Sequence, residues 1–253
     1  DFDSKLFQED LGNAPAIGQK AGERAVARLG SRKMPSCSCP IIFDPRESKG
    51  LLGHFVGGIL GSGIARGTSF LKDEMDKQIF ASGIRIIDDP HRARGSRSKA
   101  FDGEGIATQK RTIIDDGVLQ TWLLDLATSR QLGLQSTGHA ARGTSSMPSP
   151  SATNIYMEAG KLSPEELMAD IKSGFYVTET MGFGVNGVTG DFSQAASGFW
   201  IEDGKIAYPV SELTIAGNLK EMYMNMMPAS DLTFRYGIDA PTVRVAEMMV
   251  AGA

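Results

Sequence analysis

The sequence predicts an α+β fold, in which a large, mostly antiparallel β-sheet, barrel- or sandwich-like, carries a few flanking helices. Two Asp-Gly turns between apolar runs, at Asp116-Gly117 and Asp203-Gly204, are strong hairpin signals. Short strand-like runs dominate the chain after residue 84, whereas clear helix starts are few. No linker-like segment divides the chain, so a single domain over residues 1–253 is expected.

Helices are expected where capping residues and apolar periodicity coincide. Asn13-Ala14-Pro15 places proline in a first helical turn, and apolar residues follow at i+4 spacing until Gly30. Ser163-Pro164-Glu165-Glu166 has the pattern of a capping box. The expected helices are 13–30, 51–63, 126–132, 163–173 and 217–226.

The expected strands are short apolar runs bounded by turn residues. A long segment rich in Gly, Ser and Pro, 136–151, is expected to be a loop, and loops of this length are usually functional or mobile. The expected strands are 39–43, 84–87, 105–114, 118–124, 153–157, 175–180, 199–202, 205–208, 210–215, 232–234 and 242–249.

Composition excludes several classes of protein. A net charge of −4 gives no broad attraction to nucleic acid or to an anionic membrane surface. The basic run 91–99 has no interleaved aromatic residues and is expected to be a solvated loop. No run is long enough to span a membrane, and no signal peptide is visible. Cys37 and Cys39 alone do not make a disulfide framework or a four-ligand zinc site, and two reduced thiols fit the cytoplasm.

Residues 51–63 are the most informative segment of the chain. On a helix of 3.6 residues per turn, its apolar side chains fall on one face and Gly53, His54, Gly57, Gly58 and Gly61 on the other. An outer helix face normally carries charged residues, and each glycine costs about 1 kcal/mol relative to alanine. Two explanations are open: another segment packs closely against this face, or a reactive face has lost its side chains.

Other motifs are weak. Residues 182–187 match G-x-G-x-x-G, but the residues that follow cannot begin a long helix, so no dinucleotide is expected. The histidines His54, His91 and His139 are far apart in sequence, and no local spacing supports a metal site. No Gly-x-Ser-x-Gly elbow and no carboxylate pair indicates a catalytic group.

Ordered segments along almost the whole chain add a resemblance to a known family. They include RGTS (66–69), TIIDDGVLQTWLLD (112–125), TNIYM (153–157), VTGDFSQAASGFWIEDGKIAYPV (188–210) and TIAGNL (214–219). In these segments the chain resembles the C-terminal domain of the TldD/PmbA metalloproteases, and within them the PmbA (TldE) branch. Members carry a further N-terminal α/β domain, and the resemblance implies that this domain is missing from the present chain.

The resemblance also implies the loss of a metal site. The active TldD branch carries His-Glu-x-x-x-His on the helix that corresponds to residues 51–63, and a cysteine near its C-terminus. Aligned through the flanking residues, these positions hold Gly53, His54 and Gly58 here, and residues 228–245 contain no cysteine. The implied assignment is therefore no catalytic residue, no metal ligand set and no cofactor in this chain. One imidazole at His54 would hold a metal poorly.

The resemblance implies a role as the non-catalytic subunit of a cytoplasmic zinc metalloprotease. The expected partner is a TldD-type subunit that holds the zinc, in a heterodimer, with a homodimer expected in isolation. The expected substrates are peptides, including precursors of peptide antibiotics and an antitoxin, and no nucleic acid or membrane is involved. Two alternatives stay open: an independent hydrolase with an unrecognised site around His54 or His139, and a regulatory protein that binds DNA gyrase.

Overall fold

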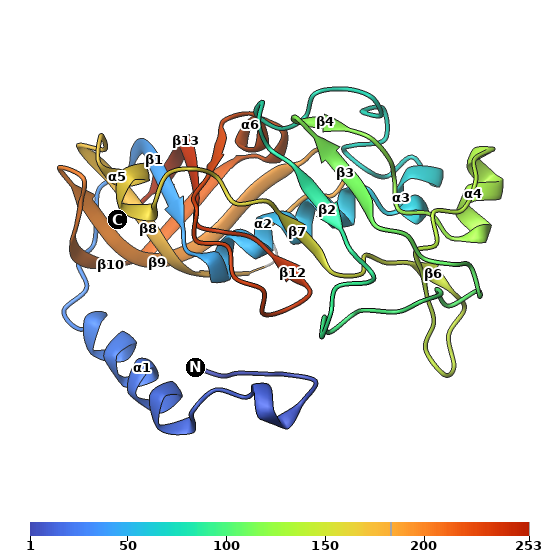
Figure 1. Cartoon of the computed structure of the whole chain (residues 1–253). Coiled ribbons are helices and arrows are strands. Elements are labelled where there is room, and N and C mark those ends of the chain that lie inside the picture. Colours follow the sequence, from blue (N-terminus) through green and yellow to red (C-terminus); the bar gives the residue numbers. More distant parts are fainter. Residues whose placement is uncertain (183, 253) are drawn as a thin grey trace.

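The computed structural model describes residues 1–182 and 184–252, and its main feature is a small β-barrel. Five strands pair in the order β1-β8-β9-β10-β13, and β13 pairs back with β1 to close the barrel (Figure 1). Within the barrel, only the β1–β8 pairing is parallel. The expected α+β class with a mostly antiparallel, barrel-like sheet is thus confirmed. The barrel strands are β1 (Cys37–Phe43), β8 (Ser173–Met181), β9 (Asp191–Glu202), β10 (Lys205–Asn218) and β13 (Val243–Ala251), and β11 (Met226–Pro228) adds to β13.

A second sheet lies beside the barrel (Figure 1). Its strand order is β12-β7-β2-β3-β4, and a separate pair, β5 with β6, lies near one end of it. The strands of this sheet are β12 (Ile238–Asp239), β7 (Ile155–Met157), β2 (Ile86–Asp88), β3 (Arg111–Asp115) and β4 (Val118–Leu119); the pair is β5 (Ala140–Ala141) and β6 (Ser149–Pro150).

Helix α2 (Pro45–Gly58) connects the two sheets, because it contacts β1 and β8 of the barrel and β12 of the second sheet. Asp44 caps its first turn by accepting a hydrogen bond from the backbone N–H of Arg46. Its inward face carries Leu51, Leu52, Phe55 and Val56 into the main core. The other helices are α1 (Ala14–Ala27), α3 (Gly61–Ala65), α4 (Leu126–Leu132), α5 (Pro164–Met168) and α6 (Leu219–Met224), with a 3₁₀ turn at Gln8–Asp10.

The centre of the core is an aromatic cluster. The Phe55 ring meets the Phe80 ring edge-on with centroids 5.1 Å apart, and Phe80 stacks on Tyr223 at 4.5 Å. The Tyr223 hydroxyl is buried and donates to the Leu51 carbonyl of α2 at 3.1 Å. The cluster therefore holds α2, which carries Gly53, His54 and Gly57 on its other face, against the rest of the molecule.

Local turn chemistry is confirmed where the sequence specified it. Asp116 and Asp203 have φ of 46°, and the glycines after them also have positive φ, as their two hairpins require. Ser163 and Glu166 make both hydrogen bonds of a capping box, although α5 is shorter than expected and ends at Met168. The basic run 91–99 is a mostly exposed loop, as expected.

Two sequence predictions are wrong. The expected helix over 51–63 breaks at Ile59 and Leu60, because their backbone groups pair with Leu123: its N–H donates to the Ile59 carbonyl, and Gly61 N–H donates to the Leu123 carbonyl. The expected strand 232–234 is irregular chain, and it leads into a bend in which the backbone N–H groups of Arg235 and Tyr236 donate to the Asp239 carboxylate.

Several boundaries also move. Strand β9 begins at Asp191, far before the expected start at residue 199, and β10 runs on to Asn218 where a helix was expected. The loop 136–151 contains the short β5 and β6. In the described part of the chain, no helix has the length and apolarity to cross a bilayer.

Candidate functional site

The outer face of α2 opens on a cleft with a volume of about 510 Å³, called the α2 cleft below. Its floor is α2, one wall follows α3, and the opposite wall comes from β9 and the segment before it. The polar and glycine positions that matter for its chemistry are Gly53, His54, Gly57, Arg66, Thr68 and Gln194.

Two explanations were open for the glycine face, close packing by another segment or a reactive face that has lost its side chains, and the glycines differ in this respect. A Cβ built on Gly53 or Gly57 meets no atom within 4 Å, so these positions are open to the cleft. A Cβ on Gly58 would lie 2.8 Å from Phe70 Cε1 and 2.9 Å from Leu71 Cδ1. At Gly61 the distance to Thr128 Oγ1 would be 2.5 Å. Close packing therefore explains Gly58 and Gly61 but not Gly53 and Gly57.

Alanine substitutions should separate these two kinds of glycine. Gly53→Ala is expected to raise the free energy of unfolding by about 0.5–1 kcal/mol, because it removes glycine from an exposed helix interior. Gly58→Ala is expected to lower it by about 1–3 kcal/mol, because the buried Phe70 and Leu71 side chains must move. Urea unfolding of both variants measures the difference, and equal effects would contradict the assignment.

His54 is the one imidazole on the α2 cleft. It lies edge-on to Phe192 with ring centroids 6.2 Å apart. Burial lowers the pKa of His54 below its usual value of 6.5, so the ring is neutral at neutral pH. No hydrogen bond joins its side chain to any of the described residues, which leaves the ring nitrogens available to a bound molecule.

The residues of the cleft do not fit a zinc ion. Zinc sites in proteins use three or four Cys, His, Asp or Glu side chains. Among residues 1–182 and 184–252, no three such side chains are grouped closely enough to hold a metal. Gly53 has no side chain to offer, and Phe70 fills the space at Gly58. The α2 cleft thus presents backbone and one imidazole where a metal centre would need a ligand set.

Sequence reasoning missed other groups on the α2 cleft. Arg66 ends α3 and is exposed on the rim, without an ion pair to any described residue. Gln194 comes from β9 and donates to the Gly182 carbonyl at 3.3 Å. Arg66 therefore places a guanidinium at the edge of the cleft, where it can meet an anionic group of a bound molecule. The RGTS segment contained Arg66, but no local pattern placed it beside α2.

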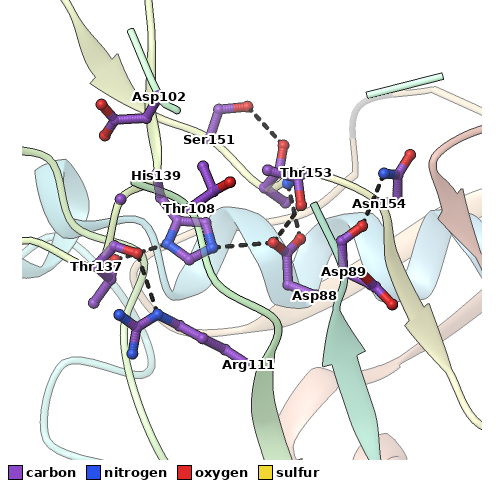
Figure 2. A network of polar contacts seen from close by, with 12 residues as sticks. Asp88, Asp89, Asp102, Thr108, Arg111, Thr137, His139, Ser151, Thr153 and Asn154 are labelled. Carbon is purple, nitrogen blue, oxygen red and sulfur yellow. Dashed lines mark hydrogen bonds and ion pairs between the residues drawn. The ribbon is translucent and has the colours of Figure 1, made fainter. Parts of the chain in front are cut away.

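His139 is part of a separate, buried network at the second sheet. Figure 2 shows its ring between Thr137 and Asp88, which comes from the end of β2. Nε2 lies 3.1 Å from the Asp88 carboxylate, and Nδ1 lies 2.8 Å from the Thr137 hydroxyl. Asp88 also accepts from the Thr153 backbone N–H at 2.8 Å and from its hydroxyl at 2.5 Å. The Asp88 and His139 side chains are 0% and 2% exposed.

The order hydroxyl–imidazole–carboxylate in this network is that of a nucleophilic triad. The Thr137 hydroxyl is already engaged, since it accepts from the Leu124 N–H at 2.7 Å. Thr137 and His139 are also buried, with 7% and 2% of their surface exposed, so the hydroxyl is not presented to solvent in this structure. The network holds β2 to the loops that carry Thr137 and Thr153.

The remaining candidates are dispersed. His91 is an exposed loop residue with Nε2 3.1 Å from the Thr108 hydroxyl. Cys37 and Cys39 are free thiols on β1, and burial raises the pKa of Cys39 to about 12, which keeps it protonated and unreactive. The G-x-G-x-x-G segment leads into β9 and not into a helix; its residue Phe183 lies outside the described residues.

Comparisons with known proteins identify the family of the chain. Residues 36–252 match the family of the PmbA/TldA metallopeptidase C-terminal domain. "Metalloprotease PmbA" of Escherichia coli O157:H7 is 41% identical over 96% of this chain and 52% of its own length. "Metalloprotease PmbA homolog" of Buchnera aphidicola subsp. Acyrthosiphon pisum is 38% identical over 100% and 55%. The chain thus spans about half the length of these relatives.

Solved structures share the fold. A Bacteroides thetaiotaomicron protein described as a candidate modulator of DNA gyrase superposes with a TM-score of 0.89 at 32% identity, over 98% of this chain and 55% of its own. TldE of Thermococcus kodakarensis superposes at 0.87 with 24% identity, over 99% and 58%, and supports the fold alone. With its barrel, its α2 helix and its family match in agreement, the chain belongs to the PmbA/TldA metallopeptidase C-terminal domain family.

Proposed function

We propose that this chain is the non-catalytic, PmbA/TldE-type part of a two-component zinc metallopeptidase. In this role it binds a TldD-type partner, which holds the zinc, and helps to form the groove that receives a peptide. The observation that carries the proposal is the α2 cleft, which is open at Gly53 and Gly57. Among the described residues, no three His, Cys, Asp or Glu side chains lie close enough together to hold a metal ion. A cleft of about 510 Å³ lies within the range of ligand-binding sites.

The open glycines also suit the proposed substrate. A peptide that lies against α2 can approach the helix backbone closely at Gly53 and Gly57, because no side chain stands there. Arg66 offers a guanidinium to a carboxylate of the peptide. In isolation the protein is proposed to form a homodimer, and its site of action is proposed to be the cytoplasm.

Zinc analysis of the purified protein tests the proposal. We expect far less than one zinc per chain for the protein alone, and about one zinc per heterodimer after addition of a TldD-type partner. Stoichiometric zinc that stays bound to the protein alone after gel filtration would contradict the assignment.

Filling the cleft should affect peptide cleavage by the complex without affecting assembly. Gly57→Trp is expected to lower the cleavage rate at least about tenfold, a difference of about 1.4 kcal/mol, because the indole occupies the space proposed for the peptide. Gly50→Trp is the matched control: Gly50 lies one heptad earlier on α2, is equally open, and does not line the cleft. Equal rates for the two variants would exclude a role of the cleft in binding the peptide.

The alternative of an independent hydrolase places the chemistry at His54. It predicts cleavage by the protein without a partner, abolished in His54→Ala. We expect instead that His54→Ala leaves zinc binding by the heterodimer unchanged. The description of related structures as candidate gyrase modulators keeps a third function open, and it predicts binding to purified gyrase in the absence of a TldD-type subunit.

A further inference from the structure

A second cavity region lies at the start of α2, between α1 and the barrel. Two adjoining hollows of about 360 and 420 Å³ share the side chains of Lys20, Arg24, Asp44, Arg46 and Tyr176. We call them together the basic cavity. No residue of α1 is buried, so this helix rests on the domain mainly through the groups around these hollows.

Apart from Arg28, which pairs with Glu179, the cations of the basic cavity have few partners. Lys20 and Arg235 form no ion pair with a described residue, and Arg24 and Arg46 share one carboxylate, that of Asp1. The Nε of Arg46 is buried and has no hydrogen-bond partner among the described residues. A buried guanidinium N–H without an acceptor is unfavourable, so this position calls for an anion.

The acidic groups that line the cavity are engaged elsewhere or exposed, and Glu23 of α1 accepts from the Gln19 side chain at 2.8 Å. Asp44 accepts from the Arg46 backbone N–H and from the Tyr176 hydroxyl. Asp231 accepts from the Thr242 N–H and hydroxyl at 2.8 and 2.7 Å. Asp239 accepts from backbone N–H groups of its own turn, and Glu165 lies in the exposed first turn of α5. Their oxygens therefore do not satisfy the arginines at the centre.

The cations also act on one another. Burial, and then the nearby positive charge of Arg46, lower the pKa of Arg24. Burial, and then the charges of Arg24, Arg235 and Arg46, lower the pKa of Lys20. Burial is the larger cause of both shifts and repulsion among the cations adds to it, and an incoming anion would relieve that repulsion.

The structure contains a stand-in for such an anion. The carboxylate of Asp1 bridges the guanidinium groups of Arg24, at 3.5 Å, and Arg46, and its side chain is only 6% exposed. Asp1 reaches this position from a segment whose next residues, Phe2 and Lys5 among them, are exposed. Asp1 thus accepts a hydrogen bond from Arg46 and makes a longer ion pair with Arg24, which shows that one oxyanion can contact both guanidinium groups.

We propose that the basic cavity is an oxyanion-binding site, in which Arg24 and Arg46 hold a carboxylate or phosphate group of a small molecule and Lys20 and Arg235 neutralise its outer charge. The Asp1 carboxylate occupies the same place and competes with the ligand. The site is distinct from the α2 cleft and does not depend on the function proposed for it.

Calorimetric titration of the protein with inorganic phosphate, glycerol 3-phosphate and succinate, against sodium chloride at equal ionic strength, tests the proposal. Saturable binding of at least one oxyanion is expected, with no saturable response to chloride. Phosphate binding alone would identify a free-ion site, and preference for the ester or the dicarboxylate a larger ligand. Asp1→Asn is expected to tighten binding about threefold by removing the competitor, and Arg46→Gln to weaken it about tenfold.

Two further variants guard against an unfolded protein. Lys20→Gln, on the exposed face of α1, should also weaken binding, whereas Arg85→Gln, whose ion pairs lie on the second sheet, should not. Circular dichroism and the thermal midpoint show which variants are folded. Absence of saturable binding in both the parent protein and Asp1→Asn, or equal affinity in folded Lys20→Gln, Arg46→Gln and Arg85→Gln, would overturn the proposal.

Discussion

Replacing Asp88 by alanine is expected to lower the free energy of unfolding by about 3–5 kcal/mol, because several buried groups lose their acceptor and each unsatisfied group costs about 1–3 kcal/mol. The substitution leaves His139 Nε2, the Thr153 hydroxyl and the Thr153 backbone N–H without their common acceptor. All three lie inside the protein, where water cannot replace the carboxylate. Urea unfolding at neutral pH measures the loss.

Two variants interpret that result. Asp115→Ala removes an exposed carboxylate that pairs with Arg85 on the same sheet, and it should change the free energy of unfolding by less than about 1 kcal/mol. Asp88→Asn keeps an oxygen for the Thr153 N–H and should retain part of the stability. An effect of Asp88→Ala as small as that of Asp115→Ala would show that the network does not hold β2 to its loops.

Replacing Phe55 by alanine is expected to lower the free energy of unfolding by about 3–5 kcal/mol, because it leaves a cavity in the tightly packed core. Phe55 is fully buried and contacts the rings of Phe80 and Tyr223. These contacts fix α2, so the variant should also loosen the α2 cleft and increase amide hydrogen exchange along the helix.

Phe101→Ala is the matched control for Phe55→Ala. The Phe101 side chain is 65% exposed, and its removal should change the free energy of unfolding by about 0.5 kcal/mol or less. If both variants lose the same stability, or if exchange along α2 does not change in Phe55→Ala, the aromatic cluster is not what positions the helix.

The sequence was sufficient for features that depend on near neighbours in the chain. The Asp116-Gly117 and Asp203-Gly204 turns need positive φ at adjacent residues, and such dipeptides supply it locally. The capping box at Ser163 needs only the residue three positions on. These elements are therefore found where they were expected.

Features that depend on partners far away in the sequence were not predicted, because local patterns carry no information about those partners. The residues near Ile59 give no sign that its carbonyl accepts from the Leu123 N–H, so the sequence did not predict the break between α2 and α3. The first half of β9 is rich in small residues, and its extended state follows from pairing with β8 and β10.

The candidate site was only half predictable. The apolar and glycine faces of α2 followed from periodicity, and the glycines at 53 and 57 do face a cleft. Whether a glycine is open or packed depends on which side chains lie opposite it. Phe70 packs at Gly58 of α2 and Thr128 at Gly61 of α3, and neither residue belongs to the helix whose periodicity was analysed. The basic cavity is lined by residues of α1, α2 and the bend before β12. These segments are far apart in the sequence, so residue spacing could not predict that they meet.

The central claim, that this chain contributes to peptide cleavage only through a catalytic partner, is tested most directly by a peptide-cleavage assay. The purified protein is incubated with a peptide substrate alone, with a TldD-type subunit, and with that subunit after removal of zinc by a chelator. We predict cleavage only in the mixture that retains zinc. Zinc-dependent cleavage by the purified protein alone, at a rate similar to that of the mixture, would contradict the claim.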